Sequence, residues 1–167
     1  MANGLVHITT TSFTTQASVS IDDCFSASYT HYIVKRNLLG SVGDINIDVR
    51  LRVGGVDASA ANYRRQLVVV NSTTINAGRA TTDTNMLRAL GYTEATSFGY
   101  SELWISNPFE AVRTTAWSDY ANDQDGSIIL EAGVYEYDPT TSYDGFTAIP
   151  ASGTITGSIS VWGLVKA

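Results

Sequence analysis

The stretch Asp44-Ile45-Asn46-Ile47-Asp48-Val49-Arg50-Leu51-Arg52-Val53 places an aliphatic side chain at every odd position and a polar or charged one at every even position. Because the side chains of a β-strand point alternately to its two faces, this period of two predicts a strand with one face in a core. The glycine pair that follows, Gly54-Gly55, predicts a turn at its end. The alternation predicts a buried set, Ile47, Val49 and Leu51, and a set that points outward or into a subunit interface, Asp48, Arg50 and Arg52.

Similar patterns lie on both sides of this strand. Residues 63–71 contain the run Leu-Val-Val-Val and predict a second strand that is more buried at its centre. Residues 153–163 alternate again, and Ile155, Ile159 and Val161 fall on one face. Gly157 falls on that same inward face, where a strand glycine indicates a bulge or a bulky neighbour such as an aromatic ring over the gap.

The remaining strand signals are short and are separated by Gly, Asn, Asp and Pro. They cover residues 5–10, 13–21, 29–35, 100–106, 112–116 and 127–137. About eight or nine short strands without a convincing amphipathic helix predict an antiparallel β-sandwich, jelly-roll-like in its connections. Residues 83–90 could form a helical turn or two instead. The length and the absence of a linker predict a single domain over residues 1–167.

Composition excludes several classes of function. The chain has a formal net charge of −6 and scattered Lys and Arg residues, so we expect no nucleic-acid partner. No apolar run approaches the roughly 20 residues that span a bilayer, and the first residues, Met1 to Gly4, lack the regions of a signal peptide. We therefore expect a protein that is made in a cytoplasm and has no membrane partner.

The residue types that usually carry chemistry are few and dispersed. The single cysteine, Cys24, predicts a buried thiol with no disulfide and no metal. His7 and His31 stand apart, and no strained Gly-x-Ser-x-Gly turn indicates a catalytic triad. Asp119, Asp123 and Asp125, followed by Gly126, superficially resemble a calcium loop, but the twelve-residue loop and its closing Glu are missing. A solvated turn between two strands is the preferred interpretation. We expect no enzymatic activity, no cofactor and no metal.

The aromatic residues could serve in one of two ways. If they converge on an exposed groove they could stack on a sugar ring, but sandwich cores and subunit interfaces also use large rings heavily. Core or interface is the preferred interpretation, with a glycan site as the alternative. The residues concerned are Tyr100, Trp104, Trp117, Tyr120 and Trp162.

Three segments give the chain a family resemblance. They are Val49-Arg50-Leu51-Arg52-Val53-Gly54-Gly55-Val56-Asp57 with Tyr63 and Gln66 after it, Ile105-Ser106-Asn107-Pro108-Phe109, and Ser142-Tyr143-Asp144-Gly145-Phe146-Thr147 running through Ile149-Pro150 into Gly153-Thr154-Ile155-Thr156-Gly157. Together they resemble a family of short β-rich domains of bacteriophage particles, found at the tips of tail-fibre-like proteins or as small free-standing particle proteins. The segments Gly4-Leu5-Val6 and Phe25-Ser26-Ala27-Ser28-Tyr29 also resemble that family.

The resemblance implies a structural role on the virion surface, a jelly-roll-like sandwich and a homotrimer, and it identifies no catalytic residues. The leading hypothesis is a capsid decoration, or cement, protein that bridges subunits of the major capsid protein after synthesis in the bacterial host cytoplasm. The alternative is a tail-fibre or receptor-binding tip that contacts a host surface glycan or protein. A carbohydrate-active enzyme on a sandwich fold is a third hypothesis.

A homotrimer also follows from the apolar side chains that the alternation turns outward. A sandwich buries only its inner faces, so outward apolar groups in a chain that is only 16% charged need another covering surface. Val6 is expected on this outer face together with the candidate subunit-interface residues, which are Trp104, Trp117, Trp162 and Leu164.

Overall fold

The computed structural model describes residues 4–124 and 127–165, and these contain thirteen β-strands and no helix. The expected all-β antiparallel architecture is confirmed, whereas the expected number of strands was too low. The strands are β1 (Leu5–Gln16), β2 (Val19–Ile21), β3 (Tyr29–Gly40), β4 (Ile45–Val53), β5 (Val56–Asp57), β6 (Tyr63–Asn71), β7 (Thr74–Asp83), β8 (Tyr92–Thr93), β9 (Gly99–Ser106), β10 (Thr114–Gln124), β11 (Ser127–Tyr137), β12 (Gly145–Pro150) and β13 (Ile155–Val165).

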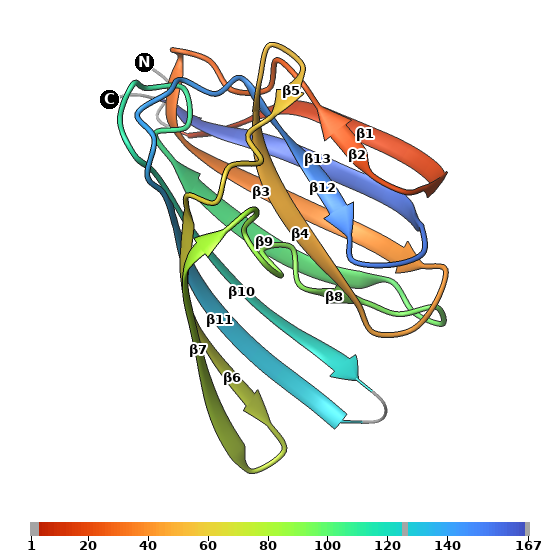
Figure 1. Cartoon of the computed structure of the whole chain (residues 1–167). Helices are drawn as coiled ribbons and strands as arrows, with labels where there is room; N and C mark the ends of the chain where they lie inside the picture. Colours follow the sequence, from red (N-terminus) through yellow and green to blue (C-terminus); the bar gives the residue numbers. More distant parts are fainter. Residues whose placement is uncertain (1–3, 125–126, 166–167) are drawn as a thin grey trace.

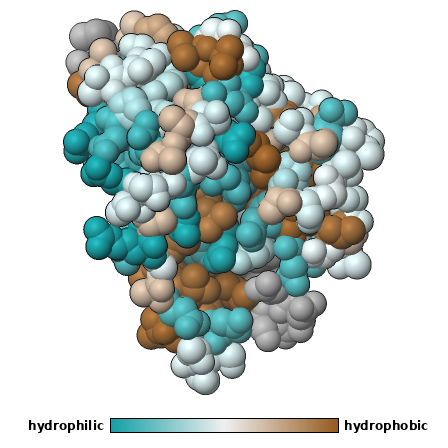
Figure 2. Space-filling view, viewed as in Figure 1, coloured by the Kyte–Doolittle hydropathy of each residue, from teal (hydrophilic) through white to brown (hydrophobic). Residues whose placement is uncertain are grey.

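The strands form two sheets of unequal size that face each other (Figure 1). The large sheet has the order β1-β13-β3-β9-β10-β11-β6-β7, and the small sheet has the order β2-β12-β4-β5, with β8 paired to β4. The β6–β7 and β10–β11 hairpins project past the small sheet (Figure 1). Viewed from the small sheet, the surface is largely polar, and apolar side chains gather toward these distal hairpins (Figure 2). The jelly-roll character of the connections stays a prediction.

The core lies between the two sheets and has the composition that the alternating strand predicts. Ile47, Val49 and Leu51 are fully buried on β4, and Ile155, Ile159 and Val161 face them from β13. The core also includes Cys24, whose burial as a free thiol is confirmed. On β13, Gly157 lies opposite Phe13, next to a register shift in β1, as a strand glycine on an inward face suggests.

The outward set on β4 was only partly right, because Asp48 is buried. A helical turn was one possibility for residues 83–90, but residues 84–90 form bends and turns that run along β4 between its pairings with β5 and β8. The backbone N–H of Arg88 donates a hydrogen bond to Asp48 Oδ1 at 2.8 Å, and Asn85 Nδ2 donates to Oδ2 at 3.0 Å. The buried carboxylate therefore satisfies polar groups of a turn that a sequence pattern within β4 does not reveal.

The limits of several strands, and four whole strands, differ from the expectations. The first two predicted strands divide at Gln16 instead of after Thr10, so β1 is long and β2 is short. Strand β10 begins at Thr114 and continues to Gln124, beyond the predicted 112–116. Four strands were not predicted: β5, β7, β8 and β12.

No helix among the described residues is long and apolar enough to cross a membrane.

Candidate functional site

The outer face of the large sheet carries one continuous row of side chains that runs across all eight strands. Residues that are directly paired in antiparallel strands point to the same face, so the register of the sheet defines the row. From the β1 edge to the β7 edge its members are His7, Trp162, Ile33, Trp104, Trp117, Val134, Gln66 and Arg79. The row brings together residues that are distant in sequence, and it includes all three tryptophans of the chain.

Three of the four predicted interface residues lie in this row. Trp104 and Trp117 are cross-strand partners, their ring centroids lie 6.5 Å apart at an interplanar angle of 45°, and their exposed fractions are 36% and 43%. Trp162 is separated from them by β3 and makes an edge contact with the His7 ring at 4.8 Å. Leu164 lies one row away, where it pairs with Leu5 at the edge of the sheet.

Val6, which was expected on the same outer face, is on the opposite side of β1. It pairs with Gly163, whose side of β13 is buried against the ring of Tyr29. Of the other aromatic candidates, Tyr120 is buried, as the core interpretation predicts, and Tyr100 is exposed on the outer face.

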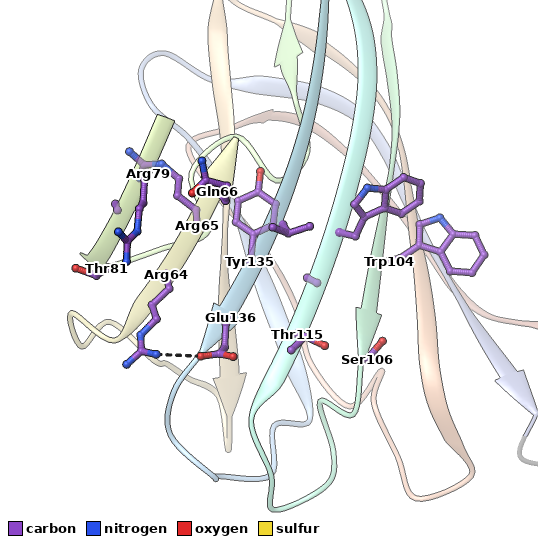
Figure 3. Close-up of a pocket in the computed structure, with 14 residues that line it drawn as sticks. Arg64, Arg65, Gln66, Arg79, Thr81, Trp104, Ser106, Thr115, Tyr135 and Glu136 are labelled. Atoms are coloured by element: carbon purple, nitrogen blue, oxygen red, sulfur yellow. Dashed lines mark hydrogen bonds and ion pairs between the residues drawn. The ribbon is translucent and has the colours of Figure 1, made fainter. Parts of the chain in front are cut away.

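A groove of about 560 Å³ lies over the β7 half of the row (Figure 3). Trp104 and Trp117 form one wall, and β6 and β7 form the other with Arg64, Gln66 and Arg79. Ser106 and Thr115 lie on the same strands as the tryptophans, and Val134 and Glu136 lie on β11 between the two walls. Sequence reasoning found only the tryptophan wall, because the opposite wall is identified by register alone.

The charges in the groove are mostly neutralised from within. The Arg64 guanidinium contacts Glu136 at 3.3 Å and also pairs with Asp138, and Arg113 reaches the same two carboxylates at 3.6 and 3.2 Å. Arg79 is exposed and forms no ion pair with any described residue. The groove therefore contains one cation that is available to an incoming group.

Three neutral polar side chains of the groove are also available. Gln66, Ser106 and Thr115 form no side-chain hydrogen bond with any residue that the structure describes. A groove with an aromatic wall and a few unengaged polar groups has the composition of a ligand site, where the polar groups fix the orientation of the ligand.

A hydrogen-bonded cluster lies next to the tryptophan wall. The Lys35 ammonium contacts Glu102 at 2.9 Å, and the Tyr100 hydroxyl donates to the same carboxylate at 2.7 Å. Hydrogen bonds from Lys35, Tyr100 and Trp104 hold the pKa of Glu102 below its usual range.

Among the described residues, the histidines and the possible metal ligands stand apart from one another. His7 and His31 form side-chain hydrogen bonds with Thr10 and Thr30 at 2.8 and 2.9 Å, and among the described residues neither histidine pairs with a carboxylate. No group of three or more His, Cys, Asp or Glu residues within 4–124 and 127–165 could hold a metal ion. Asp125 and Gly126, from the acidic turn considered above, lie outside the described residues, as does the side chain of Asp123.

The large sheet also buries an arginine and an ion pair on its inner side. Arg36 is 1% exposed and donates from Nε to the Ser101 hydroxyl at 2.9 Å, and burial lowers its pKa to about 10. Arg88 contacts the buried Glu131 at 2.9 Å. Both groups are covered from solvent by the sheet and the 84–98 segment, so we assign them to the stability of the fold.

No family model matches the chain, and neither the curated proteins nor the solved structures contain a significant match to it.

Proposed function

We propose that this protein is a non-enzymatic structural protein of a bacteriophage particle, a capsid decoration protein that acts as a closed homotrimer. Its action is binding: each interface that exists only in the assembled shell stabilises that shell by mass action. The observation that carries the trimer is a pair of separate exposed apolar patches near opposite edges of the large sheet.

The first patch lies on the distal hairpins and is called the distal patch. Its side chains point to the outer face and are exposed by 45–78%, and little polar surface separates them. Its members are Val68, Ile75, Ile128 and Leu130. Monomeric proteins rarely leave several large aliphatic groups together in water, so such a patch favours a protein contact.

The second patch lies at the β1 edge and is called the corner patch. It consists of Leu5, Trp162 and Leu164, and both leucines are 41% exposed. The register places these residues at the opposite end of the strands from the distal patch, so the two patches occupy diagonal corners of one face.

Two different patches suit a cyclic trimer better than a two-fold dimer. A two-fold dimer brings the same patch of both subunits together, whereas a ring joins one patch to a different patch of the next subunit. If three subunits close the ring, every distal patch and every corner patch is covered. Local three-fold sites on a capsid require such a unit, and so does a fibre axis.

The trimer is tested with paired charge substitutions. Ile75→Asp and Leu164→Asp should each convert the trimer to a monomer in sedimentation velocity, because each places a charge in one half of the interface. A mixture of the two variants retains one intact contact, so it should form a dimer that cannot close. Val56→Asp is the control, because Val56 is exposed on the small sheet. A wild-type monomer at micromolar concentration would contradict the trimer.

Placement on the particle is tested by stoichiometry. A decoration protein covers the shell, so it should match the major capsid protein in order of abundance on a gel of purified virions. A few copies per particle would instead favour the tail-tip alternative.

A further inference from the structure

We infer that the groove between the Trp104–Trp117 wall and Arg79 is a binding site for an acidic oligosaccharide, one that carries a carboxylate on a sugar ring. This inference goes beyond the proposed structural role and concerns residues outside both apolar patches. It rests on the aromatic wall, the unengaged polar groups, the single free cation and the distance between them.

The tryptophan wall provides the surface for a sugar ring. A pyranose ring has a face of C–H groups and a rim of hydroxyls, so it packs on an indole while its rim stays polar. Trp104 and Trp117 are tilted at 45° and both remain substantially exposed. An indole side chain has few rotatable bonds, so it loses little conformational entropy when a ligand binds.

The opposite wall provides hydrogen bonds at a defined distance. Trp117, Val134, Gln66 and Arg79 lie on the consecutive strands β10, β11, β6 and β7. Three inter-strand spacings of ~4.8 Å give a span of about 14 Å. This backbone span suits a chain of sugar rings that crosses the strands from the tryptophans toward the guanidinium.

The charge distribution selects an anionic sugar over a neutral one and over a polyanion. Arg79 is the free cation of the groove, and a guanidinium binds a carboxylate through paired charge-assisted hydrogen bonds. Glu136 and Asp138 already neutralise Arg64 and Arg113. The same carboxylates would repel a dense chain of phosphates such as a nucleic acid, on a protein whose net charge is −6.

The backbone around the groove argues against a peptide ligand. Extended peptides gain much of their affinity by pairing with a free strand edge. Strands β10, β11 and β6 are each paired on both sides over the groove, so their N–H and C=O groups are engaged in the sheet. The floor of the groove therefore offers only side chains, and the unpaired edge of β7 lies on the side away from β6.

The site is compatible with the proposed trimer. The distal patch lies beyond the groove along β6 and β11, and the corner patch lies at the far edge of the sheet beside β1. The two apolar patches share no residue with the groove, so substitutions can test the saccharide site and the trimer separately.

The three tryptophans provide a direct test, because each contributes one indole N–H signal to a ¹⁵N-correlated NMR spectrum. The probe is a tri-galacturonate oligosaccharide, titrated into the wild-type full chain. We expect the signals of Trp104 and Trp117, assigned by single Trp→Phe substitutions, to shift and that of Trp162 to stay unchanged. Equal shifts of all three, or no shift at millimolar probe, would overturn the proposal.

Variants then separate the roles of the two walls. Arg79→Gln should weaken binding of tri-galacturonate about tenfold, which is the effect of losing one charge-assisted contact. The same substitution should leave binding of the methyl ester of tri-galacturonate unchanged. Trp117→Ala should abolish binding of both. Arg50→Gln is the matched control, because Arg50 lies on β4 of the small sheet, and it should change neither affinity. An Arg79→Gln variant that binds tri-galacturonate as tightly as wild type would refute the charge argument.

Two further probes test the ligand class. A single-stranded oligodeoxynucleotide and a glutamate-rich peptide are titrated at the same ionic strength. Both should bind more weakly than the oligosaccharide, and tighter binding of either would overturn the assignment to a saccharide. Sedimentation of each variant shows that the trimer is intact and keeps this test separate from that of the proposed function.

Discussion

The backbone N–H of Arg88 donates a 2.8 Å hydrogen bond to the buried carboxylate of Asp48, which joins the 84–91 turn to β4 across 40 positions of sequence. Replacement of Asp48 by Ala leaves this N–H and the Asn85 amide without an acceptor. We expect a loss of about 2 kcal/mol in the free energy of unfolding, measured by urea denaturation. Asp119→Ala is the control, because Asp119 is exposed and should leave stability unchanged.

The same carboxylate should make stability depend on pH. Burial raises the pKa of Asp48, and the hydrogen bond from Arg88 opposes part of that shift. A raised pKa in the folded state means that the stabilising contribution is present below the ordinary value of 3.8 and is lost as the pH rises through the folded value. The stability of Asp48→Asn relative to wild type should therefore increase with pH across this window. A decrease in denaturation experiments would show that hydrogen bonding outweighs burial.

The burial of β4 is tested by placing one charge at a buried position and one at an exposed position of the strand. Val49 is fully buried, pairs with Ala148 and forms a bridge with Met86. Val49→Asp buries an uncompensated charge at a cost of several kcal/mol, so we expect no soluble folded protein. Val53→Asp lies on the same strand, where Val53 is 42% exposed, and should fold and melt close to wild type. Unchanged melting of Val49→Asp would show that the register is wrong.

Gly157 is a position where an added Cβ atom would clash with the neighbouring strand. An added Cβ would lie 2.1 Å from the Asn37 carbonyl oxygen on β3, and the φ of Gly157 is 142°. Gly157→Ala should destabilise the protein by on the order of 3 kcal/mol, because the backbone of β13 must move away from β3.

Gly78→Ala is the matched control for this substitution. Its Cβ would meet Leu67 Cβ at an ordinary 3.8 Å, so its effect on the midpoint of urea denaturation should be small. Equal midpoints for the two variants would contradict the close approach at Gly157.

Cys24 and the two histidines are expected to be structural. The Cys24 side chain is 3% exposed, and burial raises the pKa of its thiol, so a chromogenic disulfide reagent should not react with the native protein. In urea the same reagent should report one thiol per chain. EDTA should not change the melting temperature, and a lower value would indicate a bound metal.

The sequence was informative wherever one face of a strand is buried and the other is not. Strand β4 was found because its aliphatic residues alternate, whereas β12 was missed because most of its residues are buried on both faces. Strand β7 was missed for the opposite reason. It is an edge strand with little burial on either face, and it carries only one large aliphatic residue, Ile75.

The groove could be predicted only in part for a related reason. Trp104 and Trp117 are conspicuous as residue types, and their outward direction follows from the alternation in β9 and β10. Gln66 and Arg79 give no comparable signal, because their position opposite the tryptophans depends on a register set by β11. Period-two patterns define the faces of a strand but leave the choice of neighbouring strand open.

The pairing of Leu5 with Leu164 has a consequence for how the chain folds. Strand β1 has a single neighbour, β13, so the first strand has no partner until the last one is in place. Closing a loop of this length before any contact forms is slow, and high contact order lowers folding rates by orders of magnitude. On the ribosome, β1 would wait as an unpaired strand until β13 emerges. Folding should therefore be completed after synthesis, with a phase in refolding kinetics that circular permutation joining β13 directly to β1 accelerates.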